Sequence, residues 1–168
     1  MKHISSTLPT NHDRQTIENQ TAKSHGLEAM TLTWNKPPVI APIIEKPLSE
    51  LRVAVAASTG VHLRTDIPFT ITGDSSYRII PGDVAYNDIT ITHVRYPNQA
   101  AHKDLDTVFP LNTLRQLKHQ GIIGEVSPVH VSWMGHVPRV DTLIEVMAPQ
   151  IAELFEENGV DIALMSPG

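Results

Sequence analysis

The stretch Leu51-Arg-Val-Ala-Val-Ala-Ala57, closed by Ser58-Thr-Gly60, decides the fold of this chain of 168 residues. The run is apolar and partly β-branched, with no alternation between apolar and polar positions. Such a run is typical of a strand buried on both faces of a parallel sheet, and the turn formers mark its carboxyl end. We therefore predict that this segment is the first core strand.

Two later apolar runs have the same character. The segment 122–131 predicts a second core strand, in which Gly124 and Pro128 indicate a bulge or a late start. The segment 160–165 predicts a third strand, followed directly by Ser166-Pro-Gly168. We expect all three strands to lie buried in one sheet.

A helix is predicted between the first and second of these strands. Pro110 suits the first position of a helix, where its missing N–H costs no hydrogen bond. Leu111, Leu114 and Leu117 then fall on one face of the helix. Gly121 suits the left-handed position that ends it.

A second helix is predicted between the second and third strands. Asp141 suits the N-cap position of this helix. Its inward face is formed by apolar residues at helical spacing, namely Leu143, Met147, Ile151 and Leu154. Pro149 is expected to kink or restart the helix, because proline cannot donate to the hydrogen-bond ladder. Gly159 is expected to cap it.

Strands that alternate with helices predict an α/β fold, and buried runs predict a mainly parallel sheet with helices on its faces. We predict a Rossmann-like or flavodoxin-like three-layer domain over residues 51–168. Two shorter extended segments, Tyr77–Ile80 and Ile89–Val94, have no assigned place in it. Residues 1–33 are polar and aperiodic, which predicts a disordered tail, and the proline-rich segment 34–50 predicts an extended lead-in.

The composition limits the classes of function. Thirteen basic and eighteen acidic side chains give a formal net charge of -5, which offers no electrostatic basis for binding nucleic acid. No apolar run approaches the ~20 residues of a membrane-spanning helix. The absence of cysteine excludes disulfides, thiolate metal sites and thiol nucleophiles from any mechanism that the chain runs alone. We expect a cytoplasmic protein with no membrane partner and no cofactor.

Candidate binding residues follow from the strand order, because ligands of open parallel sheets lie beyond the carboxyl ends of the strands. Segments 58–63, 130–136 and 166–168 each follow or end a predicted strand, so we expect them to share one rim. Gly60 permits close backbone approach, and His62 can carry a proton near neutral pH, which suits a small carboxylate ligand. The alternative is an ordinary turn with a solvated histidine, since no glycine-rich phosphate-binding pattern is present.

Other polar and aromatic residues have weaker signals. His130 and His136 lack a third ligand at a suitable spacing, so no metal site is predicted. Trp133 and Met134 are more typical of core packing than of a pocket wall. Asp66, Asp74 and Arg78 fall in the irregular region after the first strand, where charged side chains usually face water.

Several longer motifs follow one another along the chain. They are Thr59-Gly-Val-His-Leu-Arg64, Gly73-Asp-Ser-Ser-Tyr-Arg78 followed by Ile79-Ile-Pro81, Val108-Phe-Pro-Leu111 with Leu114-Arg115, Gly124-Glu-Val-Ser-Pro-Val-His130, Ala148-Pro-Gln-Ile-Ala152 and Gly159-Val-Asp-Ile-Ala-Leu164. In order and spacing this series resembles the selenoprotein B family of glycine, sarcosine, betaine and D-proline reductases. The resemblance covers about residues 39–168.

The resemblance implies that the complete protein reductively cleaves a C–N bond at the α-carbon of a small amino acid or betaine. Known family members are longer and carry a selenocysteine or cysteine nucleophile just past the strand that matches 160–165. The resemblance therefore implies no catalytic residue in this chain and a nucleophile directly after Gly168, with other reductase subunits as partners. The substrate-binding residues that it implies are Gly60, His62, Asp74, Tyr77, Arg78 and His130.

This picture adds two expectations about the site. An imidazolium at His62 or His130 beside the nucleophile would favour its anionic form. Arg78 could pair with a substrate carboxylate if the irregular region folds back over the rim.

Three hypotheses stay open. In the first, the chain is the amino-terminal part of such a reductase, and a UGA codon meant as selenocysteine follows Gly168. In the second, it is a non-catalytic α/β module that binds a small carboxylate. In the third, it is the product of a damaged gene and does not fold, because the missing part leaves apolar surface exposed.

Overall fold

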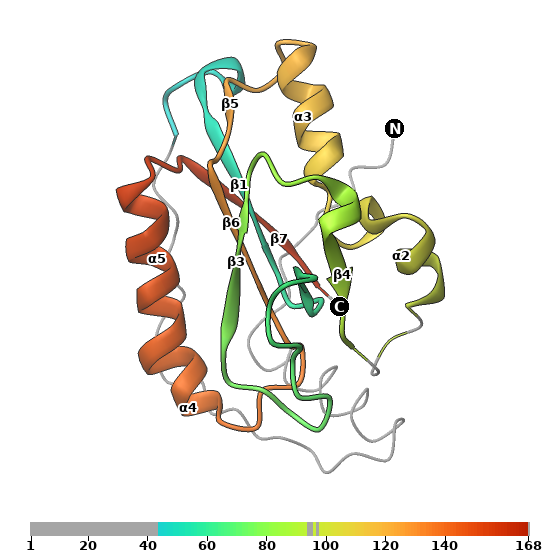
Figure 1. Cartoon of the computed structure of the whole chain (residues 1–168). Coiled ribbons are helices and arrows are strands. Elements are labelled where there is room, and N and C mark those ends of the chain that lie inside the picture. The colour runs from blue at the N-terminus through green and yellow to red at the C-terminus, as the bar shows by residue number, and fades with distance from the viewer. Residues whose placement is uncertain (1–43, 94–95, 97, 168) are drawn as a thin grey trace, which may run out of the picture. The chain divides into compact units, whose positions relative to one another are not determined.

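A mainly parallel sheet with helices on both faces forms the part of the chain that the computed structural model describes (Figure 1). The described residues are 44–93, 96 and 98–167, and they belong to one unit, Ile44–Gly168. The predicted tail and the first part of the predicted lead-in, up to residue 43, lie outside the described residues. The rest of the lead-in, 44–50, is exposed.

The elements follow the chain in a regular order. The strands are β1 Arg52–Ala57, β2 Val61–Leu63, β3 Tyr77–Pro81, β4 Ile89–Ile91, β5 Glu125–Val126, β6 Val129–Trp133 and β7 Ile162–Ser166. The helices are α2 Gln99–Lys103, α3 Leu111–His119, α4 Val140–Thr142 and α5 Ala148–Glu157, with 3-10 turns at Leu48–Glu50, Tyr86–Asp88 and Leu105–Thr107 and a π-helical turn at Leu143–Met147.

Strand β1 lies at the centre of the sheet and is buried, as predicted for the first core strand. It pairs in parallel with β5 and β6 and, separately, with β7, while β3 pairs antiparallel with β6. Ala57 at the end of β1 pairs with Ser132 of β6 and with Ser166 of β7. The carboxyl ends of the three parallel strands therefore meet at one rim, and this prediction is confirmed.

The side chains of β1 alternate between two buried clusters, because successive strand residues point to opposite faces. Val53, Val55 and Ala57 pack in the cluster that contains the apolar side of α3. Ala54 and Ala56 pack in the cluster that contains Phe155 and other residues of α5. Burial on both faces confirms the predicted α/β architecture with a mainly parallel sheet.

Helix α3 forms close to its predicted place. Pro110 is the N-cap and Leu111 begins the helix, one residue later than predicted. Leu111 and Leu114 are buried, and Leu117 packs against the same cluster. Gly121 has a φ of 71°, the left-handed value expected after the helix.

No local pattern in the sequence predicts the group that caps α3. The carboxylate of Asp106 accepts hydrogen bonds from the backbone N–H groups of Asn112 and Thr113. These donors have no partner inside the helix, so the carboxylate satisfies them and lies favourably at the positive end of the helix dipole. Asp106 lies in the turn before the helix, too far along the chain for a local capping pattern to reveal it.

The second predicted helix forms in three parts, and its predicted N-cap is wrong. Helix α4 begins at Val140 after Arg139, and Asp141 lies inside its first turn, where it pairs with Arg139. A π-helical turn follows, and α5 begins at Ala148 with Pro149 in its first turn. The predicted restart at Pro149 is thus confirmed, because the wider turn places the proline where no N–H is needed.

The second predicted core strand is divided into β5 and β6, with Ser127 and Pro128 between them. It also continues past Val131 to Trp133. Between the pairs Val53–Val126 and Ala56–Val131, the second strand is longer by two residues than β1. Pro128 therefore marks a bulge, as predicted.

Two further features differ from the expectation. Val61–Leu63 was expected in a loop, but it forms a two-stranded antiparallel sheet with Ile89–Ile91. The strand was not predicted because three residues are too few to show a strand pattern. Strand β7 was expected to be buried, but Ala163, Leu164 and Met165 are exposed. Within the described residues, β7 pairs only with β1.

Candidate functional site

The candidate site is the rim where β1, β6 and β7 end. The segment after β1 is held there from both sides, because the Ser58 N–H donates to Ser166 O and the Gly60 N–H donates to Trp133 O. The chain runs from β1 to β6 on one side and then returns across β1 to β7 on the other. Ligands of open α/β sheets bind at such a reversal, so the tips of β1 and β7 are the favoured place.

The irregular region folds back against this rim. The Asp74 N–H donates a hydrogen bond to the carbonyl of His136, which follows β6, over 3.3 Å. Gly73 lies against the same segment, since a Cβ built on it would approach the ring of Pro138 to 2.2 Å. The backbone of the irregular region therefore folds back over the rim, which is the condition under which Arg78 was expected to reach a substrate carboxylate.

His62 is buried rather than solvated, with 2% of its surface exposed. Its Nδ1 lies 2.7 Å from the carbonyl of Leu63, so Nδ1 carries the proton and donates. Its Nε2 forms a hydrogen bond of 2.8 Å with the Thr92 hydroxyl. Both ring nitrogens are engaged, and the alternative of a solvated histidine is wrong.

Gly60 has a structural role beside any contact with a ligand. Its φ of 69° lies in the left-handed region, and a Cβ at this position would stand 2.4 Å from the Thr92 carbonyl oxygen. The Thr92 N–H also donates to Gly60 O. Gly60 therefore allows the backbone after β1 to pack directly on the segment after β4.

Arg78 and His62 both contact the ring of Phe69. The Arg78 guanidinium carbon is 4.4 Å from the centroid of that ring, and the His62 ring meets the same ring edge-on at 5.8 Å. The guanidinium donates to the carbonyls of Ile67 and Tyr77 and to the Ser76 hydroxyl. These contacts use four of its five N–H groups, which leaves, within the described residues, one donor for a ligand oxygen.

Asp74 organises the loop that holds Arg78. Its carboxylate accepts hydrogen bonds from the Ser76 hydroxyl and from the backbone N–H groups of Thr70 and Ser76. Partial burial raises the pKa of Asp74, but these hydrogen bonds and the charge of Arg78 outweigh it, so the pKa lies below its usual value. Asp74 is thus an anionic anchor for the loop.

Tyr77 points to the other face of the sheet. It pairs with Trp133 and packs against the cluster of α5, whereas Arg78 pairs with Ser132 on the opposite face. Successive strand residues alternate in this way. The structure therefore brings Arg78, Asp74, His62 and Gly60 together but does not place Tyr77 with them.

His130 lies below the rim, near the start of β6, and is fully buried. Its Nδ1 accepts a hydrogen bond from the Val55 N–H, and its ring meets Phe109 edge-on. Burial, together with the nearby Arg115 charge, lowers the pKa of His130 to about 4. His130 is neutral at pH 7, so the imidazolium expected at this position is absent.

Two residues that the sequence did not single out, His93 and Tyr96, also lie at the rim beside Thr59 of the predicted segment. Thr59 and His93 are buried, and Tyr96 donates a hydrogen bond from its hydroxyl to Thr59 O over 3.1 Å. The rings of His93 and Tyr96 lie 4.6 Å apart, and burial raises the pKa of Tyr96. The histidine spacing alone gave no signal, because only the pairing of β4 with β2 brings this segment to the rim.

The Oγ1 atom of Thr59 has no hydrogen-bond partner within the described residues, although it is buried. Met134, which forms a bridge with Thr59, is also buried, so the interpretation of Met134 as a packing residue is confirmed. An unpaired buried hydroxyl is rare, and it lies at the tip of β1.

Other surfaces do not compete with the rim. Among residues 44–93, 96 and 98–167, no group of three His, Cys, Asp or Glu side chains could hold a metal ion. None of the helices formed by these residues is long and apolar enough to cross a membrane.

An open cleft of about 650 Å³ is lined by Arg52, Asp83, Arg115 and Glu125, among others. It lies at the start of β1, opposite the rim.

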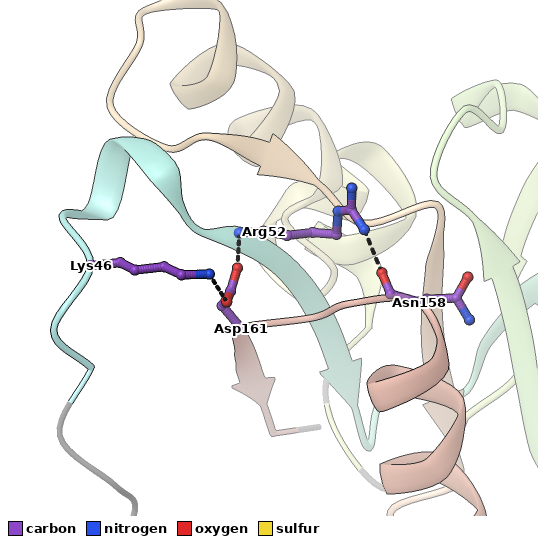
Figure 2. A network of polar contacts seen from close by, with 4 residues as sticks. All are labelled: Lys46, Arg52, Asn158 and Asp161. Carbon is purple, nitrogen blue, oxygen red and sulfur yellow. Dashed lines mark hydrogen bonds and ion pairs between the residues drawn. The ribbon is translucent and has the colours of Figure 1, made fainter.

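A network of polar contacts closes that same end of the sheet (Figure 2). Asp161 accepts hydrogen bonds from the Arg52 N–H and from the Lys46 ammonium, and the Arg52 guanidinium donates to Asn158 O. The network ties the start of β1 to the turn before β7. It has a structural role, because its groups are engaged with one another.

Comparisons with known proteins point to one family. The model of the family described as "Glycine/sarcosine/betaine reductase selenoprotein B (GRDB)" matches residues 32–167. The D-proline reductase subunit gamma of Acetoanaerobium sticklandii is 36% identical over 132 residues, which are 79% of this chain and 54% of that protein. The sarcosine reductase complex component B subunit beta of Peptoclostridium acidaminophilum is 31% identical over 96 residues, 54% of this chain and 22% of that protein. No solved structure matches significantly.

Proposed function

The chain belongs to the glycine/sarcosine/betaine reductase selenoprotein B family, and from this premise we propose that it is the amino-terminal part of a reductase subunit. The complete subunit would cleave a C–N bond at the α-carbon of a small amino acid or betaine. The chain spans about half the length of the D-proline reductase subunit that it matches. The proposal places the nucleophile, a selenocysteine or cysteine, directly after Gly168.

The observation that carries this proposal is the reversal of strand order at β1: β6 is added on one side of β1, and β7 is then added on the other. The tips of β1 and β7 adjoin there, with the Ser58 N–H bonded to Ser166 O. The residue that directly follows Gly168 would lie at this crevice, where α/β proteins bind their ligands. A selenolate there is a soft nucleophile that is ionised at neutral pH more readily than a thiol.

The proposed reaction has two stages. The chalcogen electron pair forms a bond to the α-carbon while the C–N bond breaks, and the departing nitrogen takes up a proton. A dithiol then supplies two electrons: the bond between the chalcogen and the α-carbon breaks, the α-carbon takes up one proton of the dithiol, and the chalcogen returns as its anion. The dithiol becomes a disulfide and releases its second proton. This chain has no cysteine, so the dithiol would come from elsewhere in the complex. A selenolate persists in a reducing compartment, which favours a cytoplasmic location.

Each site residue receives a role in the proposal. Arg78 would use its remaining N–H to hold the substrate carboxylate, and Asp74 and Phe69 would keep the guanidinium in place. His62 would position the segment after β1, because both of its ring nitrogens bond to protein atoms. His130 would support the sheet below the nucleophile as a neutral group.

Sequencing the DNA downstream of the codon for Gly168 tests this proposal directly. The expected result is an in-frame UGA or cysteine codon followed by an open reading frame. Noncoding sequence, or a different stop codon, would contradict it.

Calorimetry on the 168-residue chain and on the extended chain distinguishes the reductase from the alternative function, a non-catalytic module that binds a small carboxylate. Glycine, sarcosine, betaine and D-proline are each titrated into both proteins. Heat of binding from the extended chain alone supports the reductase. Binding by the 168-residue chain would instead favour a non-catalytic module for small carboxylates.

A further inference from the structure

Strand β7 is apolar, yet it is exposed on both faces of the sheet. Leu164 has 41% and Met165 has 63% of its surface exposed. Their partners in β1, Val55 and Ala56, have 0% and 2% exposed. The exposure therefore begins abruptly at β7.

The register shows why each face is open. Paired residues of neighbouring strands point to the same face, so Leu164 shares a face with Val55, and Met165 shares a face with Ala56. The cluster around α3 covers Val55 and the cluster around α5 covers Ala56, but neither cluster includes a residue of β7. Parallel strands with apolar residues are stable in proteins when both faces are covered.

The outer edge of β7 is also open. Within the described residues, β7 pairs with β1 alone, so its other row of backbone N–H and C=O groups has no strand partner. An apolar edge strand without bulges, prolines or charges within it promotes pairing with another strand. One added segment that contains a strand and helices would therefore pair with the edge of β7 and cover both of its faces.

We propose that the polypeptide that follows Gly168 adds a parallel strand to the open edge of β7 and covers Leu164 and Met165 with helices. This inference rests on the proposed function, in which such a polypeptide exists. Its length is consistent with the D-proline reductase subunit, of which the matched residues make up 54%. A chain that leaves the carboxyl end of β7 returns by a crossover helix before it adds another parallel strand, as the chain does between β6 and β7 through α5.

The consequence is that the two halves of the subunit form one continuous sheet rather than two domains. The proposed nucleophile would then lie at the centre of the rim, between the existing strands and the added one. Water would be excluded from it on both sides.

Hydrogen exchange tests this arrangement in the 168-residue chain and in the chain extended through the downstream reading frame, with cysteine at any selenocysteine codon. Amides of β7 that do not pair with β1 are expected to exchange at least tenfold more slowly in the extended chain. Amides on the outer edge of β3, which pairs only with β6 among the described strands, serve as the internal control and keep their rates. Unchanged β7 rates in the extended chain overturn the inference.

A substitution provides a second test. Leu164→Lys is expected to lower the Tm of the extended chain by about 5 °C or more and to leave the 168-residue chain nearly unchanged. Ile144→Lys is the matched control, because Ile144 is 40% exposed and belongs to the π-helical turn before α5 rather than to β7, and it should affect both chains alike. Equal effects of Leu164→Lys on both chains contradict the inference.

The outcomes separate this inference from the proposed function. An extended chain that reduces its substrate but leaves β7 unprotected overturns the inference and leaves the function intact. Protection of β7 without any reductase activity of the assembled complex does the reverse. A 168-residue chain that dimerises through β7, with no protection in the extended chain, identifies a second copy as the occupant and overturns the inference, as does the absence of a downstream reading frame.

Discussion

The Nδ1 atom of His130 accepts a hydrogen bond of 2.8 Å from the backbone N–H of Val55, in the buried centre of the sheet. The bond lies where the strand formed by β5 and β6 has two residues more than β1 between paired positions. A backbone partner is displaced at such a bulge, and the imidazole takes its place. His130 is therefore part of the sheet.

Replacing His130 by alanine is expected to destabilise the protein by about 2–4 kcal/mol, because it leaves the Val55 N–H unpaired and opens a cavity. Chemical denaturation of the 168-residue chain measures this change. His119→Ala is the control, since His119 is exposed at the end of α3 and should shift the stability by less than about 0.5 kcal/mol. Equal effects of the two variants would show that the Val55 contact is unimportant.

The burial of His130 predicts a pH dependence of stability. Its pKa falls from 6.5 to about 4 on folding, so between these values the unfolded chain binds more protons than the folded chain. Stability from this group is present in full above pH 6.5 and is lost as the pH falls toward 4, by about 3 kcal/mol in total. Denaturation curves for wild type and His130→Asn across this window measure the difference. Parallel pH profiles would contradict the prediction.

Gly60→Ala is expected to destabilise the fold far more than Gly121→Ala, although both glycines have left-handed φ values of 69° and 71°. A Cβ at Gly60 would stand 2.4 Å from the Thr92 carbonyl oxygen, whereas nothing lies within 4 Å of one at Gly121. The backbone strain alone costs about 1 kcal/mol, and the clash at Gly60 adds to it. Thermal melting of both variants gives the comparison, and similar Tm losses would contradict it.

Asp161→Ala is expected to cost about 1 kcal/mol, since the Arg52 N–H loses its acceptor. Lys46→Ala removes only the exposed ion pair of the same carboxylate and should have no measurable effect on the free energy of unfolding. Figure 2 shows that both contacts meet at Asp161. A large effect of Lys46→Ala would assign the stability to the ion pair instead.

Arg78→Lys is expected to raise the KM for the amino-acid substrate of the complete reductase about tenfold or more, because lysine cannot reproduce the planar contacts with Phe69 and Ile67. Steady-state kinetics with the extended chain in its complex measures this change. Arg139→Lys, at an exposed ion pair with Asp141, is the matched control. An unchanged KM for Arg78→Lys would remove Arg78 from the proposed site.

The uninterrupted apolar run of β1 and the leucine spacing of α3 predicted their places, because burial on a face of fixed periodicity leaves a local signal. The capping role of Asp106 and the strand pairing of Val61–Leu63 had no such signal. The N-cap predicted at Asp141 was wrong because its neighbour Arg139 binds that carboxylate.

By itself, the sequence determined the mainly parallel α/β sheet, its first core strand and the family, since these depend on periodicity and on motifs read in order along the chain. Only the tertiary structure decided which candidate residues share a face. Alternation along β3 separates Tyr77 from Arg78, and the bulge before β6 draws His130 into the sheet. These outcomes depend on strand register, which is set by contacts between residues far apart in the sequence.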